Sequence, residues 1–109
     1  MICDVGDIVV VPFPFVDQPA SKRRPAIVLS NIDFNAEGYS ILSMITTKQN
    51  PAWPGDTKIT DIDTCGLRSP CLIRLKIFTL DNRIILKKIG SMAETDFVQV
   101  TDHFRKFLP

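Results

Sequence analysis

The chain has 109 residues, and 45% of them are apolar. This is enough for one compact domain with one hydrophobic core, and too little for two domains. The 13 lysines and arginines almost balance the 12 aspartates and glutamates, so binding to nucleic acid would require a local cluster of cations. No apolar run reaches the ~18 residues of a membrane helix, and Asp4 and Asp7 do not fit the cationic start of a signal peptide. We expect a single domain over residues 1–109, in the cytoplasm and away from membranes.

The three cysteines, Cys3, Cys65 and Cys71, are odd in number and show no C-x-x-C spacing. This pattern argues against a disulfide framework and against a zinc site. We interpret them as reduced thiols with packing roles. The sequence offers no other cluster of metal ligands, so we expect neither a metal nor a cofactor.

The first predicted strand, Ile8 to Phe15, contains Pro12 and Pro14. Alternate N–H groups of a strand point to the same edge, so both missing donors should fall at a sheet edge, a bulge or a bend. The link from Val16 to Arg24 ends in three consecutive cations, and a second strand, Ala26 to Ser30, should follow Pro25 directly. The sequence therefore predicts a hairpin with a basic mouth.

A third strand is predicted at Tyr39 to Thr47, after a turn or short helical connection over Asn31 to Gly38. Its apolar residues occupy both faces, as expected for a central strand. The next segment, Lys48 to Asp56, contains two prolines, a tryptophan and a glycine, and is predicted to form a surface loop.

Several short strands separated by turns follow and favour a small, mainly β barrel. We expect them at Thr57 to Ile59, Cys71 to Leu75, Ile77 to Leu80 and Arg83 to Lys88. The last segment differs, because Ser91 and Glu94 have the spacing of a capping box that begins a helix. Apolar residues then recur at helical spacing and should dock this helix on the sheet: Ala93, Phe97, Val100, Phe104, Phe107 and Leu108.

The order of four motifs resembles the MazF/PemK-like toxins of toxin–antitoxin pairs, over nearly the whole chain. These motifs are GDIVVVPFPF, SKRRPAIVLS, Ile45-Thr46-Thr47 and Thr79-Leu80-Asp81. The resemblance implies an SH3-like β-barrel of about five to seven strands with a C-terminal helix, a homodimer and an antitoxin partner. It also implies a growth-inhibiting toxin that cleaves single-stranded RNA, mRNA above all, at short sequences without a metal, leaving a 2′,3′-cyclic phosphate and a 5′-hydroxyl.

Metal-independent cleavage of RNA relies on attack by the adjacent 2′-hydroxyl, and the enzyme must stabilise the negative charge on the phosphorane. Arg24 precedes a proline, which favours an extended backbone, and its guanidinium presents two donors at once to phosphate oxygens. The resemblance makes Arg24 the catalytic arginine. Lys22 and Arg23 are then expected to bind neighbouring phosphates, since alternation should keep Arg23 and Arg24 out of one pocket.

Thr46 is the second catalytic residue that the resemblance implies. A hydroxyl is a poor base, so we expect Thr46 to donate a hydrogen bond to the phosphate or to orient the 2′-hydroxyl, with Thr47 facing the other way. Arg74 is a third candidate, because some relatives place an acidic residue beside an arginine on this strand. Here Leu75-Lys76 follow without a carboxylate. The general base is thus unassigned, and Asp17 in the hairpin loop is either that base or a turn residue.

Trp53 either stacks on an unpaired RNA base, with Lys48 beside it for phosphates, or folds over the core. His103 is the only histidine, which excludes a two-histidine mechanism. Two alternative functions remain open, the first of them because no acid is evident near Arg74. One is a catalytically inactive module that binds RNA or an antitoxin, and the other is a DNA-binding transcriptional modulator linked to the antitoxin.

Overall fold

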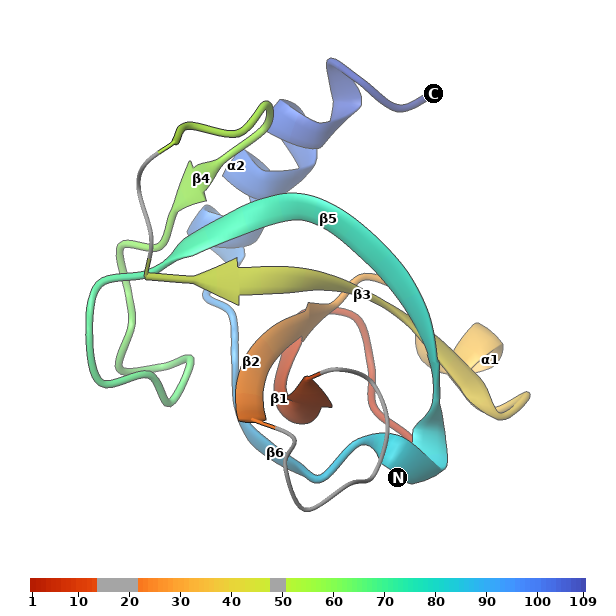
Figure 1. The fold of residues 1–109 in the computed structure, drawn as a ribbon. Helices are drawn as coiled ribbons and strands as arrows, with labels where there is room; N and C mark the ends of the chain where they lie inside the picture. The colour runs from red at the N-terminus through yellow and green to blue at the C-terminus, as the bar shows by residue number, and fades with distance from the viewer. Residues whose placement is uncertain (14–21, 48–50) are drawn as a thin grey trace.

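The computed structural model describes residues 1–13, 22–47 and 51–109. Within these ranges six strands form one antiparallel sheet in the order β4-β5-β3-β2-β1-β6. The sheet curls into a half-barrel, and the C-terminal helix lies beside the β4 and β5 end (Figure 1). The elements are β1 (Asp7–Phe13), β2 (Lys22–Val28), α1 (Ile32–Asn35), β3 (Tyr39–Thr46), β4 (Thr57–Lys58), β5 (Leu72–Asp81), the 3-10 turn η1 (Asn82–Ile84), β6 (Lys87–Ser91) and α2 (Glu94–Arg105).

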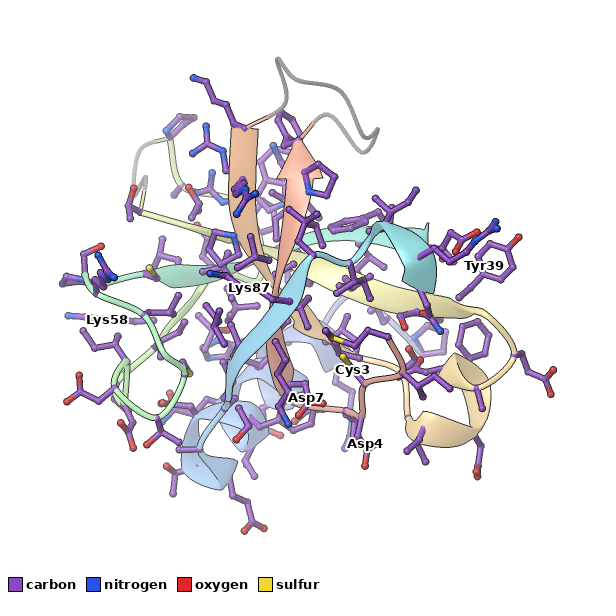
Figure 2. The ribbon with its side chains drawn as sticks, turned by 90° about the horizontal axis from the view of Figure 1, so that it is seen from below. Cys3, Asp4, Asp7, Tyr39, Lys58 and Lys87 are labelled. Carbon is purple, nitrogen blue, oxygen red and sulfur yellow. The ribbon has the colours of Figure 1, made fainter. Side chains whose placement is uncertain are left out.

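Two hydrophobic clusters cover the two faces of this sheet, because side chains alternate along each strand. Ile8 pairs with Ile27 on one face, while Val9 pairs with Ala26 on the other. The first face packs on Val100 of α2, and the second encloses Cys3 from the N-terminal segment (Figure 2). The mainly β class, the strand number and the C-terminal helix are confirmed. No helix in the described ranges is both long enough and apolar enough to span a membrane.

The prolines of β1 explain where its pairing ends. Val10 accepts a hydrogen bond from the amide of Leu86, so its backbone polar groups face β6, and those of Pro12 face the same way. Pairing with β6 stops at Val10, which leaves the missing donor of Pro12 on an unpaired side, as the sequence predicted. Pro14 lies outside the described residues.

The second strand begins four residues earlier than predicted, at Lys22 instead of Ala26. Lys22, Arg23 and Arg24 pair with Phe13, Pro12 and Val11 of β1. The cations therefore belong to the strand and not to a turn. A run of charges favours a loop, but here pairing with the apolar strand β1 determines the structure.

Two of the strand predictions for the C-terminal half are wrong. One continuous strand, β5, replaces the two predicted at Cys71 to Leu75 and Ile77 to Leu80. The segment expected as a strand at Arg83 to Lys88 is a 3-10 turn followed by β6, because Asp81 caps the turn by accepting from the amide of Arg83.

The predicted capping box at Ser91 is wrong. Ser91 ends β6, where it pairs with Asp7, and its amide donates to Thr64. The helix begins at Glu94, with Ala93 as a cap that has no side-chain hydrogen bond. Val100 and Phe104 of the predicted stripe are buried, while Phe107 and Leu108 lie beyond the helix and are exposed.

Candidate functional site

The candidate site lies where β2 and β3 separate. The last backbone pair between these strands is Ala26 with Met44, and the next residue of β2 is Pro25, which has no N–H to donate to β3. Without that donor the ladder ends, and a pocket of about 320 Å³ opens. Its lining comes from the ends of β1, β2, β3 and β5: Phe13, Arg24, Pro25, Met44, Ile45, Thr46, Thr47, Cys71, Arg74 and Lys76.

Arg24 and Thr46 meet in this pocket for a geometric reason. Continued for two residues past the pair of Ala26 and Met44, the antiparallel register sets Arg24 opposite Thr46 on the same face. The sequence-predicted catalytic pair is thus brought together across the opening. Thr47 was expected to face the other way, but it also lines the pocket, because regular strand geometry ends at Thr46.

Arg74 and Lys76 enter the pocket through a bulge in β5. Ser43 of β3 pairs with Ile77, and Ile45 pairs with Ile73, so three β5 residues face a single β3 residue. The carbonyl of Arg74 accepts a hydrogen bond from the Ser43 hydroxyl, and the carbonyl of Leu75 accepts one from Trp53 Nε1 at 3.0 Å. Bulges re-aim side chains, and here two cations line the same pocket as Arg24.

Asp56 supplies the carboxylate that the sequence did not reveal beside Arg74. Its two oxygens accept from Arg74 Nε at 3.0 Å and from Nη2 at 2.9 Å. These hydrogen bonds raise the pKa of Arg74, although its burial opposes the shift. The expectation that Arg74 lacks an acidic neighbour is therefore wrong. Because Asp56 also accepts from the amide of Trp53, its oxygens are engaged in holding the loop and the arginine.

Trp53 lies across β5 and is 39% exposed. The ammonium of Lys76 sits 4.3 Å from its ring centroid, a cation–π contact. The ring is thus neither folded into the core nor free on both faces. Lys48, the other expected RNA contact of this loop, lies outside the described residues, as does Asp17.

The remaining predicted cations take different positions. Arg23 does not line the pocket, as alternation along β2 predicted, and Lys22 is exposed at the start of the strand. His103 is far from Arg24 in sequence and contacts Thr57, with Nδ1 2.7 Å from the hydroxyl oxygen.

The pocket can bind and stabilise an anion. Its described lining contains three cationic side chains and two threonines but no carboxylate or imidazole. Among the described residues no carboxylate lies within ion-pair distance of Arg24, so within these ranges no ion pair neutralises its charge. In the same ranges, no group of three or more His, Cys, Asp or Glu side chains is arranged to hold a metal ion.

A family comparison covers almost all of the chain. The profile of the PemK-like, MazF-like toxin of type II toxin–antitoxin systems matches residues 4–108. This chain belongs to that family. A search of curated protein sequences found no match.

Solved structures share the fold of this PemK/MazF-like toxin. MazF in a MazE–MazF crystal structure from Deinococcus radiodurans is 20% identical, with a TM-score of 0.78 over 99% of this chain and 97% of that chain. A mycobacterial endoribonuclease in complex with its cognate antitoxin is 12% identical, with a TM-score of 0.72 over 96% and 91%. Toxin MazF-mt6 of Mycobacterium tuberculosis is 14% identical, with a TM-score of 0.73 over 92% and 93%. At these identities the likeness is one of fold.

Two side chains of the toxin's site were missed by sequence reasoning. Lys76 follows Arg74 by two residues, a spacing that signals a shared face, but the predicted break between two strands hid it. Asp56 lies 18 residues before Arg74, and no local sequence pattern predicts a contact across that separation. Only the pairing of β4 with β5 makes it evident.

Proposed function

We propose that this toxin is a sequence-specific endoribonuclease that cuts single-stranded RNA, mRNA above all, and so inhibits translation and growth. The observation that supports it is the meeting of Arg24, Thr46, Arg74 and Lys76 around one pocket. Arg24 and Lys76, together with Arg74 in its ion pair with Asp56, provide donors and positive charge for a phosphorane without a metal ion. The proposal therefore includes metal-independent chemistry.

In the proposed reaction the 2′-oxygen attacks the adjacent phosphorus, and the bond to the 5′-oxygen breaks. The products are a 2′,3′-cyclic phosphate and a 5′-hydroxyl. Arg24 donates to the non-bridging oxygens as negative charge develops, and the Thr46 hydroxyl donates to the phosphate or orients the nucleophile. Arg74, held by Asp56, adds charge from the opposite wall.

The 2′-hydroxyl must lose a proton and the 5′-oxygen must gain one. Asp56 is a poor candidate for the base, because its carboxylate accepts two hydrogen bonds from Arg74. Asp17, in the hairpin loop, remains the proposed general base of the reaction. Its role rests on the sequence alone.

The proposed partners follow from the family and from the charge of the site. The similar structures include MazE–MazF complexes, and an acidic, disordered antitoxin segment would complement the cations and block RNA. We also propose a homodimer and a cytoplasmic location, where mRNA is found.

A second candidate function is binding without cleavage. It would make the chain an inactive module that holds RNA or the antitoxin, or a modulator of transcription that acts through the antitoxin. The observation that favours it is the lack of a carboxylate or imidazole in the described pocket lining. Such a protein would bind RNA through the same cations and leave it intact.

One experiment separates the two functions. Purified protein is incubated in EDTA with a mixed-sequence single-stranded RNA and, in parallel, with the same RNA carrying 2′-O-methyl groups throughout. The proposal predicts cuts in the first RNA alone, with cyclic-phosphate and 5′-hydroxyl ends. Intact RNA in both reactions, or cleavage of the methylated RNA, would contradict it.

A further inference from the structure

A second, larger pocket lies on the other side of Arg24. It measures about 530 Å³ and is formed by β2, β1, β6 and the loop at residues 66–68. It shares Arg24 and Pro25 with the first pocket, so the two pockets adjoin along this part of β2. Its lining is Val10, Arg23, Arg24, Pro25, Gly66, Leu67, Arg68, Lys87 and Ile89.

The sheet register explains why these side chains share a face. Lys87 of β6 pairs with Val10 of β1, and Val10 pairs with Pro25 of β2. Arg23 and Ile89 lie two residues further along their strands and therefore point the same way. Arg24 borders this pocket as well, so the expectation that Arg23 and Arg24 never share a pocket holds for the first pocket and is wrong here.

Arg68 is brought to this face by a close contact between two glycines and the opposite backbone. Gly66 has φ of +74°, and a Cβ there would lie 2.1 Å from the carbonyl oxygen of Ile89. A Cβ on Gly90 would lie 2.5 Å from the carbonyl group of Cys65. Only glycine at both positions lets the loop lie against β6 this closely. Arg68 follows Gly66 by two residues, and it lines the same pocket as Lys87.

All the charged residues in the described lining of this pocket are cationic. Four of its described lining residues are Lys or Arg, and none is Asp or Glu. None of the four has a carboxylate within ion-pair distance in the part of the chain that the structure describes. In contrast, the next residue, Lys88, faces the other way and pairs with Asp7 at 3.1 Å. Figure 2 shows Lys87 on β6, apart from Asp7.

We propose that Arg68 and Lys87 bind a phosphate next to the cut phosphate in the same RNA strand. The strand would then pass from the first pocket to the second at Arg24, which lines both. Leu67, Val10 and Ile89 offer an apolar floor for a ribose or base between the cations. The nature of the ligand rests on the proposed function. The chemistry of the pocket fits a phosphodiester backbone, because contacts to phosphates position a strand without reading its sequence.

The test measures the binding of a fluorescent 20-nucleotide RNA that is 2′-O-methylated throughout and cannot be cut. Anisotropy gives Kd over a series of salt concentrations for the wild type, Arg68→Ala, Lys87→Ala and the double variant. Arg105→Ala, at the end of α2, removes one charge elsewhere. Each lost phosphate contact should reduce the slope of log Kd against log salt by about 0.7, and the double variant should bind about tenfold more weakly at 0.1 M salt.

The outcomes separate this inference from the proposed function. An unchanged slope and Kd in the double variant overturn the inference, even if the wild type cuts RNA. A reduced slope supports it, even if the wild type leaves RNA intact and the cleavage proposal fails. If the double variant binds an acidic peptide more weakly but RNA as tightly as the wild type, the pocket belongs to an antitoxin segment and the inference is wrong.

Discussion

Asp56 holds the guanidinium of Arg74 with both of its carboxylate oxygens, at 3.0 Å from Nε and 2.9 Å from Nη2. The side chains are 16% and 9% exposed, so the pair is largely shielded from water. A two-point contact fixes the plane of the guanidinium as well as its position. The loop before β4 therefore sets the direction in which Arg74 presents its charge to the pocket.

Asp56→Asn should leave the buried charge of Arg74 without a full partner. We expect the free energy of unfolding to fall by about 1–3 kcal/mol and RNA cleavage at saturating substrate to slow. Urea unfolding and single-turnover cleavage measure the two effects. Arg83→Ala is the control, because its ion pair with Asp81 leaves Arg83 89% exposed, and it should unfold at the same urea concentration as the wild type. Wild-type cleavage by Asp56→Asn would show that the pair only supports the fold.

The roles of the Trp53 ring and of its Nε1–H group can be tested with two different substitutions. Trp53→Phe keeps an aromatic ring but leaves the carbonyl of Leu75 without its donor, which should cost about 1 kcal/mol of stability. Trp53→Ala also removes the ring. If RNA bases stack there, Trp53→Ala should weaken RNA binding by about 1–3 kcal/mol beyond Trp53→Phe. Equal RNA affinity of the two variants would assign Trp53 to the fold alone.

Two glycines with positive φ should respond differently to alanine. In Gly66→Ala the new Cβ would lie 2.1 Å from the Ile89 oxygen, whereas at Gly38 nothing lies within 4 Å. We expect Gly38→Ala to cost about 1–2 kcal/mol from backbone strain alone and Gly66→Ala to cost distinctly more. Thermal unfolding of the two variants gives the comparison. Equal melting temperatures would mean that the loop of Arg68 is not pressed against β6.

Buried Asp96 should make stability depend on pH in the acid range. Burial alone would raise its pKa, but hydrogen bonds from the Thr60 hydroxyl and from the amides of Asp61 and Thr60 bring the pKa below its ordinary value. A lowered pKa contributes stability that is present above about pH 4 and is lost as pH falls through the folded-state pKa. Urea unfolding between pH 5 and pH 2.5 should therefore show a steeper loss in the wild type than in Asp96→Asn. Parallel curves would contradict this assignment.

The central part of the fold was predictable because its signals are local. Apolar residues on both faces of Tyr39–Thr46 placed β3 at the centre of the sheet, and the two prolines of the first strand indicated an unpaired side. Pro25 also marked the place where Arg24 would be held extended. The two predicted catalytic residues lie at the separation of β2 and β3 for these reasons.

The errors arose where tertiary pairing outweighs local preference. Three cations at Lys22–Arg24 resemble a turn, yet pairing with β1 makes them a strand. The bulge at Arg74–Lys76 resembles a break between strands, because its hydrogen bonds come from Ser43 and Trp53 instead of a regular ladder. Ser91 has the spacing of a helix cap, but it pairs with Asp7 at the end of β6 instead.

The central claim is that Arg24 stabilises the charge that develops on the cut phosphate. The most direct measurement is the single-turnover rate of RNA cleavage in EDTA by Arg24→Ala, beside the wild type and Arg105→Ala, with folding checked by circular dichroism. Loss of one donor to a developing oxyanion predicts a rate at least ~100-fold below the wild type, with Arg105→Ala unaffected. A folded Arg24→Ala protein that cuts within about threefold of the wild-type rate, far less than such a loss, would contradict the account.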